Sequence, residues 1–196
     1  LAAGARLYPG VHLEGDTSIG QSAQIGPDTF ITGSHVGPGA HVWYAVVRRA
    51  EIGEGAEVGP YVSLRPGTVL GPNSKAGTFV EMKNAVIGEK SKVPHLAYMG
   101  DVEVGVGANV GAGTITVNYD GYSKHRTVIK DGARIGSDTM LVAPVTIGEN
   151  AFTGAGSTIS RDVSDGALAV ERAKQKEIPG YAAKREERHR RELEES

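Results

Sequence analysis

One stretch of the sequence, residues 79–101, combines side chains that could do chemistry together. It reads FVEMKNAVIGEKSKVPHLAYMGD, and Lys83, His95 and Tyr98 stand among its aliphatic residues. This mixture suits neither a packed strand nor a regular helix, so the stretch is either decorated surface or part of a site. Lysine binds anions, and histidine is the usual proton acceptor near neutral pH. The stretch therefore indicates a site that holds an anion beside a base.

A repeat of six residues surrounds this stretch and must position its side chains. Aliphatic residues followed by glycine recur along the chain, and neighbouring pairs are repeatedly six residues apart. The cleanest runs are Ile135, Leu141, Ile147, Thr153 and Ile159, and Ile19, Ile25 and Ile31. Small residues stand two positions earlier in many units: Ala23, Ala40, Ala50, Ala56, Ala108, Ala133 and Ala151. Period two within period six predicts one short strand per unit, with its small and aliphatic residues on one side.

Units of six residues are typical of an all-β fold, the parallel β-helix, whose stacked coils bury a continuous aliphatic column. Three units in each coil predict a triangular prism with flat faces. The 28 glycines fit many regularly placed tight corners. The repeat itself does not determine the handedness. A sandwich of short strands is the alternative, but it predicts turn signals about every 8 to 12 residues and no strict step of six.

The repeat breaks between Thr116 and Ile129. The segment VNYDGYSKHRTV carries turn-forming residues and no aliphatic step. It predicts a loop that leaves the prism, and loops on a rigid scaffold often carry function.

The composition changes again after Val170, where charged residues dominate. Pro179 and Gly180 form a breaker, and Glu186 and Arg190 have the spacing of a helical ion pair. We expect a β-helix domain over residues 1–170 and a partly helical tail over residues 171–196. A solvated helix over residues 182–196 either caps the open end of the prism or frays.

Composition and charge exclude several classes of function. The chain has no cysteine, which excludes disulfides, thiolate chemistry and sulfur-ligated zinc, and fits a reducing cytoplasm. The net charge of -2 and the dispersed basic residues do not support a nucleic-acid partner or a polybasic membrane patch. The opening LAAGARLYPGVHL lacks the pattern of a signal peptide, and no apolar run approaches the ~20 residues of a membrane span. We expect a cytoplasmic chain without a membrane partner.

Six ordered motifs carry a resemblance to a known family. They are LRPG at 64–67, FVEMKNA at 79–85, HLAYMGD at 95–101, NVGAGTITVNYDG at 109–121, IGSDTMLVAPVTIG at 135–148 and GAGSTISRDV at 154–163. Together they resemble the acetyltransferase domain of the bifunctional N-acetylglucosamine-1-phosphate uridyltransferase and glucosamine-1-phosphate acetyltransferase family. The similarity spans almost the whole chain, including its opening residues.

The resemblance implies a left-handed parallel β-helix that assembles as a homotrimer. It implies acetyl transfer from acetyl-CoA to the amine of glucosamine-1-phosphate. The product would serve UDP-N-acetylglucosamine and cell-wall precursor synthesis. The family's uridyltransferase domain is expected to be absent from this chain, because no glycine-rich nucleotide loop opens an α/β unit.

The resemblance also implies roles for individual residues. His95 matches the family's proton acceptor, which must remove a proton from the ammonium form of the substrate before it can attack a thioester. Sugar-phosphate contacts fall on Arg65, Lys83, Tyr98, Asn109 and Lys124, with Lys124 reaching a neighbouring subunit's site. Contacts to acetyl-CoA fall on Ala112, Asn118, Tyr119, Ser137, Ala155 and Arg172. Asn118 and Tyr119 match positions near the acetyl group, and Arg172 matches a contact to the coenzyme phosphates.

The sequence departs from the family pattern at three positions. Thr78 stands where asparagine is common, Val117 where many members have cysteine, and Tyr122 adds bulk to the loop before Lys124. These differences concern the fine geometry and the loop conformation rather than the reaction.

Two other functions are compatible with a hexapeptide repeat. A zinc carbonic anhydrase of the same fold would bind its metal through three histidines across a trimer interface. His35 and His41 are six apart and are expected to stack on adjacent units, although no third ligand is evident. A trimeric scaffold without catalysis would tolerate changes at His95 and Arg65.

Overall fold

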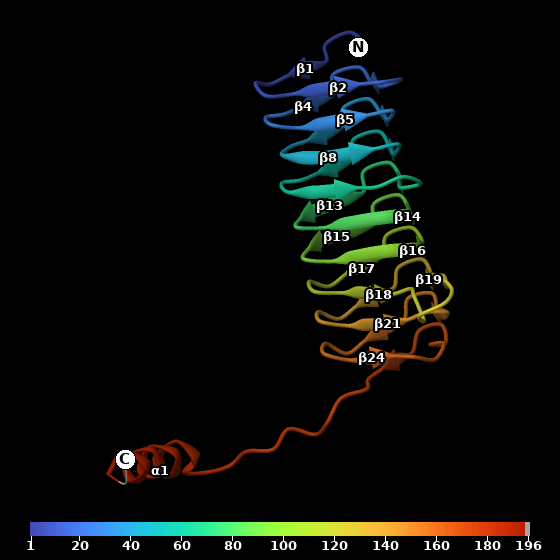
Figure 1. Ribbon diagram of the computed structural model, residues 1–196. Helices are drawn as coiled ribbons and strands as arrows, with labels where there is room; N and C mark the ends of the chain where they lie inside the picture. Colours follow the sequence, from blue (N-terminus) through green and yellow to red (C-terminus); the bar gives the residue numbers. More distant parts are fainter. Residues whose placement is uncertain (195–196) are drawn as a thin grey trace.

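A computed structural model describes residues 1–194, and the strands β1 to β25 coil into a long prism with three flat faces (Figure 1). The strands are short and pair in parallel with strands of the turns before and after. This arrangement follows from the repeat, since each unit supplies one strand and three units close one turn. The predicted β-helix is confirmed, and it forms a solenoid of about ten turns.

Ten strands form face 1, in chain order along the prism. They are β1 (Arg6–Leu7), β4 (Gln24–Ile25), β7 (His41–Val42), β10 (Glu57–Val58), β13 (Lys75–Thr78), β15 (Lys92–His95), β17 (Asn109–Val110), β20 (Arg134–Ile135), β23 (Phe152–Thr153) and β25 (Leu168–Ala169).

The remaining strands form faces 2 and 3, which are joined because β14 and β16 run across the corner between them. Face 2 holds β2 (His12–Glu14), β5 (Phe30–Thr32), β8 (Ala45–Arg48), β11 (Val62–Leu64), the first halves of β14 (Glu81–Ile87) and β16 (Tyr98–Val104), β18 (Ile115–Val117), β21 (Met140–Val142) and β24 (Thr158–Ile159). Face 3 holds β3 (Ser18–Ile19), β6 (His35–Val36), β9 (Glu51–Ile52), β12 (Val69–Leu70), the second halves of β14 and β16, β19 (Thr127–Ile129) and β22 (Val145–Ile147).

The solenoid is left-handed. In Figure 1 the front strands β5 and β8 run from left to right while successive turns descend from the N-terminus, which defines a left-handed coil. The handedness expected from the family resemblance is confirmed.

The core is a stack of aliphatic side chains, one from each face of each turn. On face 2 the register places Ile31, Val47, Leu64, Met82 and Met99 one above another, and all are fully buried. The five residues of the cleanest repeat are at most 5% exposed, and the seven alanines noted above are at most 3% exposed. The predicted inward set is therefore confirmed. The stack explains how such short strands gain stability, because each turn covers the apolar surface of the next.

Two kinds of corner residue let the turns stack closely. A Cβ atom on Gly53 would lie 2.7 Å from the carbonyl carbon of Gly71 on the next turn, so glycine is required there for space. The other corners need a left-handed backbone. Tyr61 and Asn84 adopt φ values of 59° and 47°.

A loop protrudes where the repeat was expected to break, but it is shorter than the sequence indicated. Strand β19 begins at Thr127, and Thr127 and Ile129 are buried in the prism. The protruding residues are therefore 118–126. Residues paired on successive turns are 17 apart just before the loop, as for Val86 and Glu103. Across the loop the separation rises to 25, as for Glu103 and Val128, because the loop adds residues to that turn. The loop ends earlier than expected because Thr127 and Ile129 point into the core, as the alternate residues of every other unit do.

The chain leaves the prism after β25 and reaches helix α1 (Tyr181–Glu194) through a segment without regular structure. The helix has no buried residue and stands away from the prism (Figure 1). The expectation that the helix caps the open end of the prism is therefore wrong for residues 182–194. Residues 195–196 of the expected helix lie outside the described residues. Within residues 1–194 no helix is long and apolar enough to span a membrane. The domain boundary at residue 170 stays a prediction.

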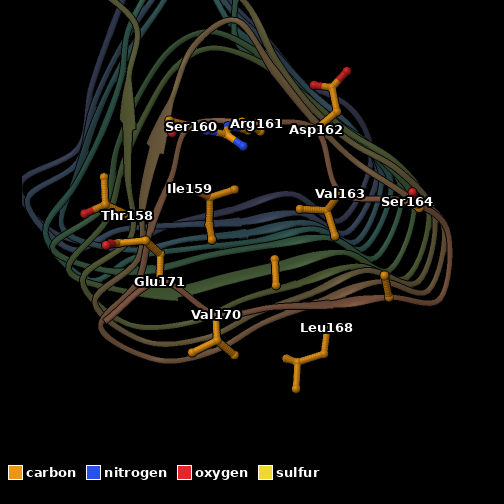
Figure 2. A pocket seen from close by; sticks show the side chains of 12 residues that line it. Thr158, Ile159, Ser160, Arg161, Asp162, Val163, Ser164, Leu168, Val170 and Glu171 are labelled. Carbon is orange, nitrogen blue, oxygen red and sulfur yellow. The ribbon is translucent and has the colours of Figure 1, made fainter. Parts of the chain in front are cut away.

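The last turn leaves a hollow at the open end of the prism (Figure 2). Residues from Thr158 to Glu171 line it, and Ile159 and Val163 point into it. None of the predicted site residues lines this hollow. It is the uncovered end of the core, where no further turn follows.

Candidate active site

A group of cations forms where face 2 ends, midway along the prism. The register places Arg65 beside Lys83, and Lys83 faces Gly100 on the next turn. Lys124 comes from the protruding loop and lies against Lys83. We call Arg65, Lys83 and Lys124 the cationic cluster. It can hold a phosphate, because lysine and arginine donate several charge-assisted hydrogen bonds to anionic oxygen.

The two lysines affect each other. Contact with Lys83 and repulsion by its charge lower the pKa of Lys124, while Asp101 and Tyr98 act in the opposite direction. The family resemblance implied that Lys124 reaches a neighbouring subunit's site. The structure places it beside Lys83 of its own chain, and its reach to a neighbour stays a prediction.

Arg65 forms an ion pair that the sequence did not indicate. Its Nη1 donates to Glu81 Oε1 at 2.8 Å, and both side chains are half-buried. The hydrogen bond from Arg65 to Glu81 is also the main reason that the pKa of Arg65 is raised. A guanidinium has five N–H donors, so Arg65 can keep Glu81 and still bind phosphate.

Tyr98 lies over Gly100, next to the loop. A Cβ atom on residue 100 would lie 2.5 Å from the Tyr98 hydroxyl oxygen and 2.7 Å from Asn118 Nδ2. A methyl group at residue 100 would overlap both side chains, so any residue other than glycine would displace them. Sequence reasoning missed Gly100, although it lies within the motif HLAYMGD.

Hydrogen bonds within the protruding loop fix its shape. Asp120 accepts backbone N–H groups from Tyr122 and Ser123 at 2.8 and 2.7 Å, and pairs with His125 at 2.7 Å. The Ser123 N–H contributes most, and with the His125 and Tyr122 bonds it holds the pKa of Asp120 far below its ordinary range. The carboxylate is therefore ionised and closes the loop, while Tyr119 and Tyr122 remain exposed.

His95 heads a column of small residues at the edge of face 1. It pairs with Thr78 on the turn before, and its carbonyl oxygen accepts the N–H of Gly113 on the turn after. The positions below it, one per turn, are Ala112, Ser137 and Ala155, and the Asp138 N–H donates to the Ala112 carbonyl at 2.7 Å. Side chains this small would not obstruct an extended ligand laid along the prism.

Arg172 lies at the far end of this column. Its Nη1 donates to the Ala155 carbonyl oxygen at 2.8 Å. The predicted coenzyme positions Ala112, Ser137, Ala155 and Arg172 are therefore brought into one line, with the predicted base at its other end.

The structure does not bring every predicted residue together. His95 and Asn109 lie on face 1, across the corner at Leu96 from Tyr98 and the cationic cluster. Within residues 1–194 no hydrogen bond or ion pair joins His95 to that cluster. Asn109 lies below Lys92 on face 1.

The two histidines considered as metal ligands are separated. His35 pairs with Ser18 and Glu51 on face 3, whereas His41 pairs with Gln24 and Glu57 on face 1. The expected stacking is wrong, because residues six apart lie on successive faces and only residues about one turn apart stack. Among the described residues, no group of three or more His, Cys, Asp or Glu side chains could hold a metal ion.

Comparison with known proteins gives relatives for most of the chain. Residues 126–161 match the bacterial transferase hexapeptide family, described as six repeats. The bifunctional protein GlmU of Streptomyces avermitilis is 49% identical over 181 residues, which cover 92% of this chain and 38% of the relative. GlmU of Heliobacterium modesticaldum is 55% identical over 170 residues, covering 87% of this chain and 37% of the relative. The chain thus spans less than two fifths of these relatives.

Among solved structures, UDP-N-acetylglucosamine acyltransferase of Francisella novicida has a TM-score of 0.47 and 15% identity, covering 94% of this chain and 72% of that one. A likeness of this degree says nothing about activity. The curated relatives are more informative, because identity of about one half extends over about nine tenths of the chain. The chain is homologous to the C-terminal portion of bifunctional GlmU and carries the bacterial transferase hexapeptide repeat.

Proposed function

We propose that this chain transfers an acetyl group from acetyl-CoA to the amine of glucosamine-1-phosphate. One observation carries the proposal. The predicted base His95 heads a column of small residues on one side of a corner, and the cationic cluster lies on the other side. An extended thioester in the column and a sugar phosphate held by the cluster would meet near His95 and Tyr98. The GlmU relatives and the six sequence motifs support the same assignment.

The chemistry needs few groups. The substrate amine attacks the thioester carbonyl carbon, and His95 takes the proton that the nitrogen loses. The resulting tetrahedral oxyanion collapses, the carbon–sulfur bond breaks, and the coenzyme A thiolate leaves and takes up the proton held by His95. Arg65, Lys83 and Lys124 bind and orient the phosphate. We assign Asn118 and Tyr119, which match positions near the acetyl group, as donors that stabilise the oxyanion.

We propose further that the working unit is a homotrimer with sites between subunits. Support comes from the corner beside His95, where Tyr44, Tyr61, Phe79 and Leu96 follow one another, one per turn. These four residues are 40 to 60% exposed, and the rings of Tyr61 and Phe79 stack with centroids 5.4 Å apart. We call them the corner ladder. A second copy packed against it would bury the apolar strip and complete the site between faces 1 and 2.

The product would feed UDP-N-acetylglucosamine and peptidoglycan precursor synthesis. We also place the chain in the cytoplasm, because acetyl-CoA is the proposed donor.

The proposal is tested by thiol release from acetyl-CoA in the presence of glucosamine-1-phosphate. Glucosamine and glucosamine-6-phosphate serve as controls, since the cationic cluster should select the position of the phosphate. We expect turnover with glucosamine-1-phosphate that exceeds turnover with either control. Equal rates with all three amines would contradict the substrate, and absence of thiol release would contradict the reaction.

A further inference from the structure

Asp101 lies at the corner that ends face 2 and has no role in the chemistry described so far. It is the last residue of the motif HLAYMGD. Asn84 Nδ2, one turn before, donates to its Oδ1 at 2.7 Å. Asn118 Nδ2, one turn after, donates to its Oδ2 at 2.5 Å. One carboxylate therefore links three successive turns, and the third of them is where the protruding loop begins.

The carboxylate also faces both lysines of the cationic cluster. Burial acts to raise the pKa of Asp101, but the bonds from Asn84 and Asn118 and the charges of Lys83 and Lys124 together lower it. Asp101 is therefore an anion. It offsets part of the repulsion between the two lysine charges, which would otherwise favour loss of a proton from one of them.

Asn118 depends on Asp101 for its orientation. Asn118 is 7% exposed, and its backbone carbonyl accepts the His125 N–H at 2.8 Å. Within residues 1–194 the bond to Asp101 is the one hydrogen bond of the Asn118 side chain. A hydrogen bond to an ionised acceptor is stronger than a neutral one, so the carboxylate can hold this side chain in a single rotamer.

We propose that Asp101 is a positioning residue that orients Asn118 toward the acetyl donor and keeps Lys83 and Lys124 together at the phosphate. The inference rests on the function proposed above, and it assigns to one carboxylate the alignment of the two substrates. Alignment contributes strongly to rate, because a displacement of about 1 Å can cost roughly 100-fold.

The test begins with Asp101→Asn. Asp101 has φ 49°, and asparagine adopts this left-handed conformation readily, so the variant removes the charge without straining the corner. We expect kcat to fall about 10- to 100-fold while the thermal midpoint changes little. Asp131→Asn is the matched control, since Asp131 Oδ1 accepts the Val106 N–H at 2.7 Å, away from the site. Its kcat should stay within about twofold of wild type.

A double-mutant cycle then asks whether Asp101 acts through Asn118. The four proteins are wild type, Asp101→Asn, Asn118→Ala and the double variant. If one residue positions the other, their effects are not additive, and the double variant should be no more than about threefold slower than the slower single variant. Losses that multiply would overturn the proposal, as would an Asp101→Asn variant with wild-type kcat.

A further variant tests whether Asp101 positions the site or only stabilises the corner in which it lies. Asn84→Gly removes the other amide, and glycine tolerates the φ of 47° at this position. It should keep kcat within about threefold of wild type, because the carboxylate and its bond to Asn118 remain. A loss equal to that of Asp101→Asn, with a matching fall in thermal midpoint, would show that the corner is only structural.

The wild-type assay keeps this proposal distinct from the proposed function. If wild type does not turn over glucosamine-1-phosphate, the proposed function fails. The coenzyme A affinity of the same four proteins is then measured by calorimetry. Coupling between Asp101 and Asn118 in that affinity supports the positioning role without turnover, and additive changes overturn it.

Discussion

Lys83 and Lys124 lie against each other in one chain, where the protruding loop folds back over face 2. Two like charges in contact are unfavourable unless an anion shares them. Asp101 provides part of that compensation, and a bound phosphate would provide more. The pair therefore favours an anionic ligand that spans both lysines, which leads to the first prediction.

Lys124→Ala should raise the KM for glucosamine-1-phosphate roughly 10- to 100-fold, the range for loss of a hydrogen bond to a charged group. The lowered pKa of Lys124 adds a pH signature. Lys124 loses its charge at a lower pH than an ordinary lysine, so the wild-type KM should rise toward alkaline pH. Lys124→Arg stays charged and should show a flatter profile.

Lys90→Ala is the control, because Lys90 pairs with Glu89 at 2.7 Å outside the cluster. Steady-state kinetics from pH 7 to 10 measures the effect. An unchanged KM in Lys124→Ala would remove this lysine from the phosphate site.

His95→Ala should lower kcat by about 100- to 10,000-fold, as expected for loss of a general base. Acetyl-CoA affinity should hardly change, because the column below His95 is intact. The variant should recover turnover only where alkaline pH supplies free amine, which needs no base. His35→Ala, on face 3, is the matched control, and near wild-type turnover of His95→Ala at pH 7 would refute the assignment.

Arg65→Ala should act mainly on KM for the sugar phosphate. A charge that binds the ground state and the transition state alike contributes uniform binding, so kcat should change much less. The variant also leaves Glu81 unpaired near the phosphate, which adds repulsion. Comparing KM and kcat separates this role from that of His95, and a large fall in kcat with unchanged KM would contradict it.

Replacing the corner ladder should weaken the trimer. Tyr61→Asn with Phe79→Asn removes two stacked rings while keeping residues that tolerate the left-handed backbone. We expect the trimer mass to shift toward monomer in light scattering at micromolar concentration, with unchanged secondary structure by circular dichroism. Tyr122→Asn is the control, since Tyr122 is 96% exposed at the loop. A wild-type protein that is already monomeric would refute the trimer itself.

Two truncations should separate the helix from Arg172. Ending the chain at Gly180 removes α1, which buries no residue, so thermal midpoint and turnover should stay close to wild type. Ending it at Glu171 also removes Arg172, which bonds to Ala155 at the end of the column. The shorter protein should bind coenzyme A more weakly in calorimetry. Equal coenzyme A affinities for the two truncated proteins would show that Arg172 does not contribute to coenzyme binding.

The amino-acid pattern was sufficient to predict which side chains point inward and that the chain forms stacked coils. Alternation along a strand has period two, and a unit of six residues repeats it, so Ile135 and Leu141 had to share the core. It also located the loop, the small residues of the column and, through the resemblance, the candidate base. These features depend on local spacing or on motifs that are continuous in the chain.

The contacts between residues of different turns could not be predicted from the amino-acid pattern and required the folded structure. The step between turns varies from 16 to 18 residues and rises to 25 at the loop, so spacing alone does not predict neighbours. This is why His35 and His41 were wrongly expected to stack. It is also why Asp101 was overlooked between Asn84 and Asn118. Contacts between turns depend on the summed lengths of all intervening corners, and a single added residue moves every later side chain to a different partner.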